Sequence, residues 1–268
     1  MTPSGDRASG DLARSRRRGA IALLAAAALY QGVAMSGWLP SALFPGIPDI
    51  AATALRMAED GRLAHDAGFT LYRVVAGFAL AVATGLPLGV AMARFGPVER
   101  FFLPLINAFM PIPSFALVPL FMLWSGIGDR TTILVVYYAA TFPVAFNTWT
   151  GVRAVNPLWL RAAGAMGAGE GALFWKIILP GAAPFILTAL RQAFLRAWIA
   201  VIGAEMIAGA NWGLGWVIFN AQQFLQTNVM MVAIAAIGLT GFIFERLVFG
   251  AIERATVQRW GMVRTGEH

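Results

Sequence analysis

Three ionisable side chains interrupt a long apolar run in the C-terminal third of the chain. They are Arg191, Arg196 and Glu205, and they fall within an expected membrane span over residues 182–208. Charged groups are costly in hydrocarbon, so these residues should face a bundle interior, an aqueous path or the lipid headgroups. One hypothesis is that Arg191 or Arg196 lines a path and favours anions, with Glu205 a further candidate for a path residue. The alternative is that both arginines satisfy helix ends or headgroups.

Residue sets that support catalysis are missing from the sequence. The chain has no cysteine and only two histidines, His65 and His268, so neither a thiolate site nor a histidine-based metal site is expected. No serine has a histidine close by in sequence, and Glu205 alone is not a carboxylate pair. No Gly-x4-Gly-Lys-[Ser/Thr] phosphate loop occurs, so any ATP must be bound by another chain. The sequence predicts no enzyme, no catalytic residue, no metal and no cofactor.

The composition is that of a membrane protein. Of 268 residues, 59% are hydrophobic and 12% are charged, whereas about a quarter are charged in a soluble domain. The net charge of +7 could indicate nucleic-acid binding. The arginines, however, flank apolar runs and form no single patch. We therefore expect the protein to lie in a lipid bilayer and not to bind nucleic acid.

Six apolar runs are long enough, or nearly so, to cross a bilayer as helices. They predict an all-α membrane protein in which residues 21–252 form the transmembrane domain, between tails at 1–20 and 253–268. The first run could also be a signal peptide, but no clean small-x-small cleavage site precedes Pro40, so we expect a retained helix. The runs are Ile21–Trp38, Val74–Ala93, Phe101–Gly128, Thr131–Val152, and approximately 182–208 and 229–250.

Prolines and glycines modify this simple picture. Four prolines in the third run predict a broken span whose helix begins after Pro113. Met110 in that run and Asn147 in the fourth are further candidates for path residues. In the second run, small residues recur every four positions from Gly77 to Gly89 and predict a close helix contact, either within the chain or between subunits. Short helices are expected at approximately 48–60 and, lying at the membrane interface, within 209–228.

Residues 156–180 are too polar and too rich in glycine to cross a membrane. Asn156 is a good N-cap and Pro157 suits the first helical position. Trp159, Ala162, Ala163 and Met166 then fall on one helical face. Glycines follow, and a second short helix is expected at roughly 172–178, ending at Pro180. A short helix with a small-residue face at the membrane surface is suited to docking in a groove of another protein.

The same loop resembles the "EAA" loop of the permeases of ABC importers, which reads Glu-Ala-Ala-x3-Gly-x9-Ile-x-Leu-Pro. Six positions match at the right spacing, and Arg161 stands where the family usually has Glu. Further similarity to permeases for nitrate, taurine and aliphatic sulfonates extends over roughly residues 44–260. Its clearest segments are Pro111-Ile112-Pro113, Gly126-Ile127-Gly128, Ala204-Glu205-Met206 and Gly213-Leu214-Gly215.

The resemblance implies a six-helix type I ABC-importer permease fold and a set of partners. These are cytoplasmic ABC ATPase subunits, an external solute-binding protein and a second permease copy, most simply in a homodimer. It implies a small anion such as a sulfonate, taurine or nitrate as the substrate. It also implies that the loop is the ATPase-coupling site, through Arg161, Ala162, Ala163, Met166, Gly167, Leu179 and Pro180. The alternative is a secondary transporter driven by an ion gradient.

The distribution of basic residues predicts the orientation. If the chain crosses six times, 14 Lys and Arg residues fall on one side and four on the other. The positive-inside rule then places the N-terminus, the loop at 151–180 and the C-terminus in the cytoplasm. We therefore expect a multi-pass protein of the bacterial inner membrane whose loop faces ATP.

Overall fold

A computed structural model describes residues 5–38, 40–209 and 211–255. Within these residues the regular elements are helices and no strand occurs. A helix satisfies every backbone hydrogen bond within its own segment, as a span in hydrocarbon requires. The long helices are α1 (Gly5–Met35), α3 (Arg62–Arg94), α6 (Asp129–Arg153), α9 (Leu179–Ala208) and α11 (Thr227–Ala255).

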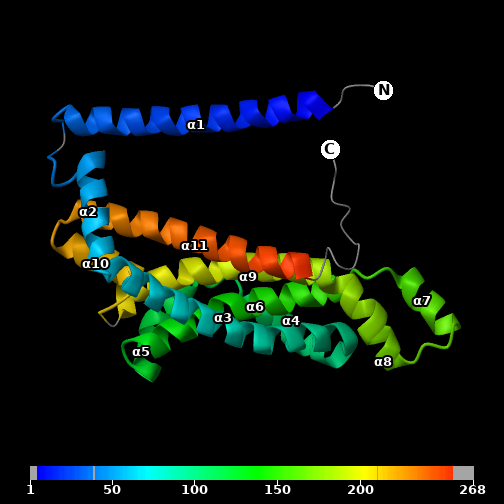
Figure 1. Ribbon diagram of the computed structural model, residues 1–268. Helices are drawn as coiled ribbons and strands as arrows, with labels where there is room; N and C mark the ends of the chain where they lie inside the picture. Colours follow the sequence, from blue (N-terminus) through cyan, green and yellow to red (C-terminus); the bar gives the residue numbers. More distant parts are fainter. Residues whose placement is uncertain (1–4, 39, 210, 256–268) are drawn as a thin grey trace.

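The shorter helices connect or extend the long ones (Figure 1). They are α2 (Ile47–Glu59), α4 (Gly96–Phe109), α5 (Val118–Ser125), α7 (Pro157–Ala165), α8 (Glu170–Leu173) and α10 (Leu214–Gln223). A 3₁₀ turn at Ser114–Leu117 precedes α5, and a π-helical turn at Phe174–Ile178 links α8 to α9. The two short helices that we expected before the second span and within 209–228 are α2 and α10.

Membrane-spanning helices are present in the expected places. Four helical segments in the described part are long and apolar enough to span, namely Arg17–Met35, Arg62–Arg94, Glu170–Ala208 and Thr227–Ala251. A fifth span forms if α4 and residues 114–125 count as one segment with a 90° bend. The remaining expected span, the fourth in the chain, is α6, which has 25 residues and is about 37 Å long. Helix α6 packs between α3 and α9. Its threonines lower its mean hydropathy, and they are tolerated because this helix is largely covered by its two neighbours and not by lipid.

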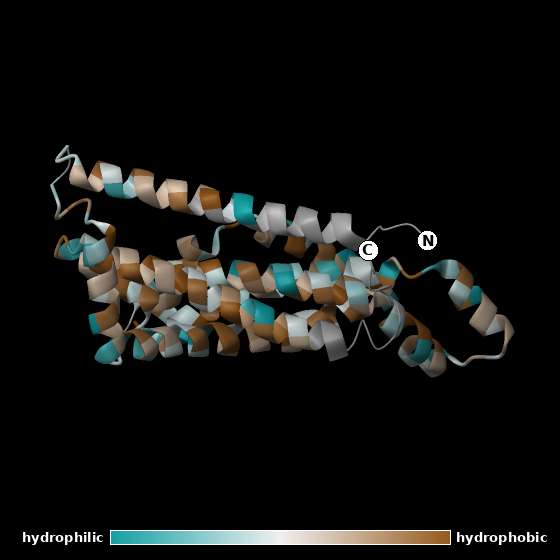
Figure 2. Ribbon diagram, turned by 45° about the horizontal axis from the view of Figure 1, so that its top comes forward, coloured by the Kyte–Doolittle hydropathy of each residue, from teal (hydrophilic) through white to brown (hydrophobic). Residues whose placement is uncertain are grey.

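The core of the bundle is the packing of α6 between α3 and α9. Small and β-branched side chains meet there, among them Val74, Ala81, Val136, Ala140 and Val144. Phe194 and Trp198 of α9 fill the remaining space. Figure 2 shows apolar residues along the long helices, including the faces that point away from this core. Apolar residues therefore occur both inside the bundle and on its outer faces. What distinguishes the core is the close packing of small side chains between helices, as in other membrane bundles.

The stripe of small residues on α3 packs within the chain. A methyl group added at Gly77 would lie 2.6 Å from Val136 Cγ1 and 2.8 Å from the carbonyl oxygen of Ile133, both on α6. At Gly85 it would lie 2.8 Å from the carbonyl oxygen of Thr141. Of the two interpretations left open by the sequence, the contact within the chain is therefore correct for these positions.

We expect Gly77→Ala to destabilise the bundle by about 1–3 kcal/mol, because backbone oxygens of α6 cannot move away cheaply. The thermal unfolding temperature of the purified protein in detergent would measure this loss. Gly68→Ala in the same helix is the matched control, because nothing lies within 4 Å of that position. It should be neutral or slightly stabilising, since Ala is the better helix former. Equal effects of both changes would contradict the packing described above.

The third expected span is broken, but its helix lies elsewhere than predicted. Its longer helix, α4, ends before the break at Pro111 and Pro113, whereas only a 3₁₀ turn and the eight residues of α5 follow. Two prolines one residue apart lack N–H donors and restrict the residues before them, so α4 cannot continue. Residues 94–100, which separate the second and third apolar runs, do not form a loop. Only Phe95 separates α3 from α4, because Pro97 suits the first turn of a new helix.

Pro180 does not end a helix, contrary to the expectation from the sequence. Helix α8, the π-helical turn and α9 form one continuous segment from Glu170 to Ala208. A proline lacks an N–H group and its ring clashes with the carbonyl four residues earlier. The wider π turn, which ends at Ile178, relieves this conflict without breaking the segment.

Helix α1 stands apart from the bundle in Figure 1. Ile21, Leu24, Leu29 and Met35 are exposed on it, and polar contacts connect it with the segment that leads to α2. Tyr30 Oη donates to the carbonyl oxygen of Pro45, and the backbone N–H of Ile47 donates to Gln31 Oε1. Residues 5–20, expected as a loose tail, are the first turns of this helix.

Candidate functional site

The expected docking helix is present and its two ends are fixed by local hydrogen bonds. The side-chain oxygen of Asn156 accepts from the backbone N–H of Leu158 at 2.9 Å and caps α7. At the other end, the N–H of Ala168 donates to Ala163 and that of Gly167 donates to Gly164. This is a Schellman motif, which needs a residue with positive φ, and Gly167 has φ +81°. The turn after α7 is therefore set by glycine at this position.

We call residues 156–173 the elbow, and Figure 1 shows it protruding from the bundle at the end opposite α10. Helix α7 contacts α8 and the π-helical turn and no other described helix to a comparable extent. Apolar side chains on and next to it remain exposed: Leu158, Trp159, Trp175 and, at 87%, Met166. An exposed apolar surface on a rigid short helix is typical of a docking site for another protein.

The structure places the predicted coupling residues in two groups. Arg161, Ala162, Met166 and Gly167 are exposed on the elbow. Ala163 near the end of α7 is half-buried, and so are Leu179 and Pro180 at the start of α9. Glu170 at the start of α8 lies 3.5 Å from Arg94 Nη2, so an exposed ion pair connects the elbow with the end of α3. The residues expected to couple thus form one continuous projection.

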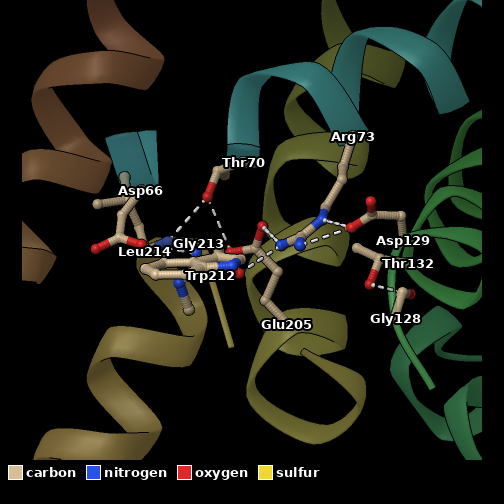
Figure 3. A network of polar contacts seen from close by, with 11 residues as sticks. Asp66, Thr70, Arg73, Gly128, Asp129, Thr132, Glu205, Trp212, Gly213 and Leu214 are labelled. Carbon is tan, nitrogen blue, oxygen red and sulfur yellow. Dashed lines mark hydrogen bonds and ion pairs between the residues drawn. The ribbon is translucent and has the colours of Figure 1, made fainter. Parts of the chain in front are cut away.

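At the opposite end of the bundle lies a buried polar network (Figure 3). Arg73 of α3 and Glu205 of α9 are both 0% exposed, and Arg73 Nη1 lies 2.7 Å from Glu205 Oε1. Arg73 Nη2 also lies 2.7 Å from Asp129 Oδ1 at the start of α6. The arginine therefore bridges two acids on two other helices. A buried ion pair needs such additional partners to offset its desolvation.

The same network fixes the connection between α9 and α10. Arg73 Nη1 donates to the carbonyl oxygen of Trp212 at 2.7 Å, and Gly215 N–H donates to Glu205 Oε2 at 2.9 Å. The hydroxyl of Thr70 donates to Glu205 Oε2 and accepts from the N–H of Leu214, both at 2.9 Å. Asp66 accepts from Gly213 N–H at 3.0 Å. This end is therefore locked by side chains of α3 and α9, not by apolar packing alone.

Sequence reasoning missed most of this network. Glu205 was singled out, whereas Arg73 was counted among the four basic residues on the side opposite the loop at 151–180, and no pairing with Asp129 was proposed. The sequence did contain one indication of this network: a glutamate within a membrane span is expected to pair with a cation on another helix. The closest arginine in sequence, Arg196, does not supply it.

The two candidate arginines of α9 have different surroundings. Arg191 pairs with Glu245 of α11, so its charge is neutralised by a neighbour. Arg196 pairs with no acid and forms no hydrogen bond among the described residues. It lines a cavity of about 260 Å³ beneath the bend between α4 and α5. The cavity is also lined by Met110, Ser114, Phe115, Tyr138 and Ile199.

The remaining path candidates lie away from this cavity. Asn147 is half-buried on α6 and is not among the residues that line the cavity. Glu205 belongs to the locked network, where Arg73, Thr70 and Gly215 already engage its two oxygens. The structure thus brings Met110 and Arg196 together and separates Arg191, Glu205 and Asn147 from them.

Comparisons with known proteins decide the family. Residues 85–258 match the family model described as "Binding-protein-dependent transport system inner membrane component". The chain belongs to this family. Among its relatives, the taurine transport system permease protein TauC of Escherichia coli is 36% identical over 76% of this chain and 74% of its own. The putative aliphatic sulfonates transport permease protein SsuC of the same organism is 33% identical over 80% of this chain and 81% of its own.

A solved structure supports the fold of this permease. An inward-facing structure of the MetNI methionine ABC transporter matches 73% of this chain and 98% of its own with a TM-score of 0.59 and 18% identity. The likeness shows the fold alone. The family match covers the end of α3 and all of α4 to α11, including the elbow, whereas α1 and α2 precede it. The chain is therefore a membrane transport subunit and not an enzyme, as the sequence predicted.

Proposed function

We propose that this permease is one of two identical membrane subunits of an ABC importer, and that the elbow receives motion from a cytoplasmic ATPase. The observation that carries the proposal is an exposed apolar helix, capped at both ends, at the position of the family's coupling loop. The sequence of the elbow is too polar to cross lipid, but its exposed apolar side chains are not expected to remain in contact with water alone. A groove on an ATPase would bury Leu158, Trp159 and Met166.

The proposed orientation places the elbow in the cytoplasm of a bacterium and the locked network at the outer face of its inner membrane. The 14-to-4 distribution of basic residues supports it. So does the position of Arg94, Arg153 and Lys176 at the elbow end of the bundle, where anionic headgroups and the cytoplasm attract cations. Both termini are then cytoplasmic, and the end at α10 is available to an external solute-binding protein.

The surroundings of Arg196 support a second permease copy. This residue lies about 26 Å from the start of α9 and about 18 Å from its end, which is well within a membrane span. Its side chain is exposed and has no acidic partner among the described residues. A free guanidinium at this depth is expected to face a protein interior or an aqueous path and not lipid. Two copies facing each other would cover it and would enclose the cavity between them.

Motion then follows a simple mechanical sequence. Closure of the ATPase on ATP moves the elbow, and the elbow moves the continuous segment from α8 into α9. The core of α3, α6 and α9 moves as one rigid unit, because the network locks its outer end. Rocking of two such units alternately opens the path inward and outward. The names of the relatives support a small sulfonate, such as taurine, as the solute.

Reconstitution into liposomes tests this proposal. The permease, its ATPase and its solute-binding protein are purified and combined, and uptake of taurine or ethanesulfonate is measured. We expect uptake that requires ATP and the ATPase chain and that vanadate inhibits. ATP-independent, vanadate-insensitive uptake by the permease alone would instead establish a secondary transporter driven by an ion gradient, and would overturn the role of the elbow.

A further inference from the structure

Arg196 is set apart from the other arginines within the spans by what surrounds it. Arg73 is paired with Glu205 and Asp129, and Arg191 is paired with Glu245. In the part of the chain that the structure describes, Arg196 has neither an acidic partner nor a hydrogen-bond acceptor. Because no carboxylate in this part of the chain neutralises the Arg196 guanidinium, its positive charge is available to a bound anion. The most direct such ligand is an anion in transit.

The cavity beside Arg196 has a polar end and an apolar wall. Arg196 and the hydroxyl of Ser114 are its available polar groups, because Tyr138 Oη already donates to the carbonyl oxygen of Phe109 at 2.6 Å. Phe115 and Ile199 belong to the apolar wall. Pockets for small organic ligands combine a mostly apolar lining with a few placed polar groups. A solute with one charged head and a short hydrocarbon arm matches this arrangement.

The position of the cavity relates it to the moving parts. It lies between α9, which continues from the elbow, and the bend at Pro111 and Pro113 between α4 and α5. Chain breaks at prolines allow one short helix to shift against another. A ligand held there contacts both the driven helix and the bend. The cavity can therefore change its exposure when the elbow moves.

From these observations we infer that Arg196 is the anion-recognising residue of the translocation path. It takes the oxyanion head of a small organic solute, such as an alkanesulfonate, while the apolar wall takes the hydrocarbon arm. The planar guanidinium presents paired N–H donors, which fit two oxygens of an oxyanion better than the single point charge of lysine does. This inference rests on the proposed importer function and assigns selectivity to one residue of the path.

The test uses the complete reconstituted importer with its loaded binding protein. The quantity measured is the number of sulfonate molecules taken up per ATP hydrolysed, with taurine and ethanesulfonate as probes. We expect Arg196→Gln to lower this ratio at least tenfold and Arg196→Lys to lower it severalfold, because lysine keeps the charge but loses the paired donors. Arg191→Gln is the matched control, and its ratio should stay within twofold of that of the unaltered protein.

Each other outcome has a defined meaning. A ratio that is unchanged in Arg196→Gln would overturn the inference. So would equal losses in Arg196→Gln and Arg196→Lys accompanied by a fall in thermal stability, because that pattern indicates a structural role. If the unaltered complex shows ATP-dependent uptake of other solutes but of neither sulfonate, the inference about the oxyanion fails while the importer function stands. If it shows no ATP-dependent uptake at all, the proposed function fails first.

Discussion

Glu205→Gln is expected to destabilise the permease by about 3 kcal/mol. Removing one partner of a buried ion pair costs about 3–5 kcal/mol, because the other charge is left without compensation. The lower end applies here because Asp129 still contacts Arg73. The NH2 group of the glutamine would also face a donor in either orientation, namely Arg73 Nη1 or the pair of Thr70 and Gly215. Thermal unfolding of the purified permease, followed by tryptophan fluorescence, measures the loss.

Asp129→Asn is the matched control for this prediction. Asp129 contacts the same arginine, but its side chain is 42% exposed, so water replaces much of the lost interaction. Its loss should be about 1 kcal/mol or less, as for exposed ion pairs. A double variant, Arg73→Leu with Glu205→Leu, should cost less than the sum of the two single changes, because neither charge is left alone. Strict additivity, or equal effects of Glu205→Gln and Asp129→Asn, would contradict the network.

Gly167→Trp is expected to abolish ATP-driven uptake while the protein remains folded. Nothing lies within 4 Å of a Cβ added at this position and Gly167 is exposed, so we expect the larger side chain to point away from the core. The strain of φ +81° costs only about 1–2 kcal/mol for an ordinary residue. The indole would, however, occupy the exposed surface that we assign to the ATPase. Uptake in the reconstituted importer should fall at least a hundredfold, with the unfolding temperature changed by only a few degrees.

Gly167→Asn separates strain from blockage in this experiment. Asparagine tolerates the left-handed conformation and is small, so it should keep most of the uptake. If Gly167→Asn loses as much uptake as Gly167→Trp, the bulk of the indole is not the cause of the loss. Uptake by Gly167→Trp within twofold of the unaltered protein would remove the elbow from the coupling pathway.

Local features of the fold could be predicted from the sequence because each depends on a few neighbouring residues. The cap at Asn156, the turn at Gly167 and the break near Pro113 follow from short-range chemistry. The long apolar runs likewise place the spans. The same local rules failed at Pro180, where a π-helical turn absorbs the proline, and at 94–100, where a helix begins directly after another. Helix continuity across such residues depends on packing, which periodicity does not report.

The pairing of distant charges was beyond sequence reasoning. Arg73 and Glu205 are 132 residues apart, and a basic residue beside a span is equally consistent with a topology signal. The choice between Arg191 and Arg196 could not be made either, because Glu245, which distinguishes them, lies on α11. Only the arrangement of helices shows which arginine is neutralised. For this reason the local geometry of the loop at 156–180 could be predicted from the sequence, whereas the pairing that separates the path candidates could not.

The location of the elbow can be measured directly, because the chain contains no cysteine and any introduced thiol is unique. Ala162→Cys on α7 and Gln223→Cys on α10 are both exposed and would lie on opposite faces of the membrane. In inside-out vesicles, a membrane-impermeant maleimide should label Ala162→Cys but not Gln223→Cys, and bound ATPase should protect Ala162→Cys. Labelling of Ala162→Cys only from the outer face, or labelling that the ATPase leaves unchanged, would contradict the assignment of the elbow as the coupling site.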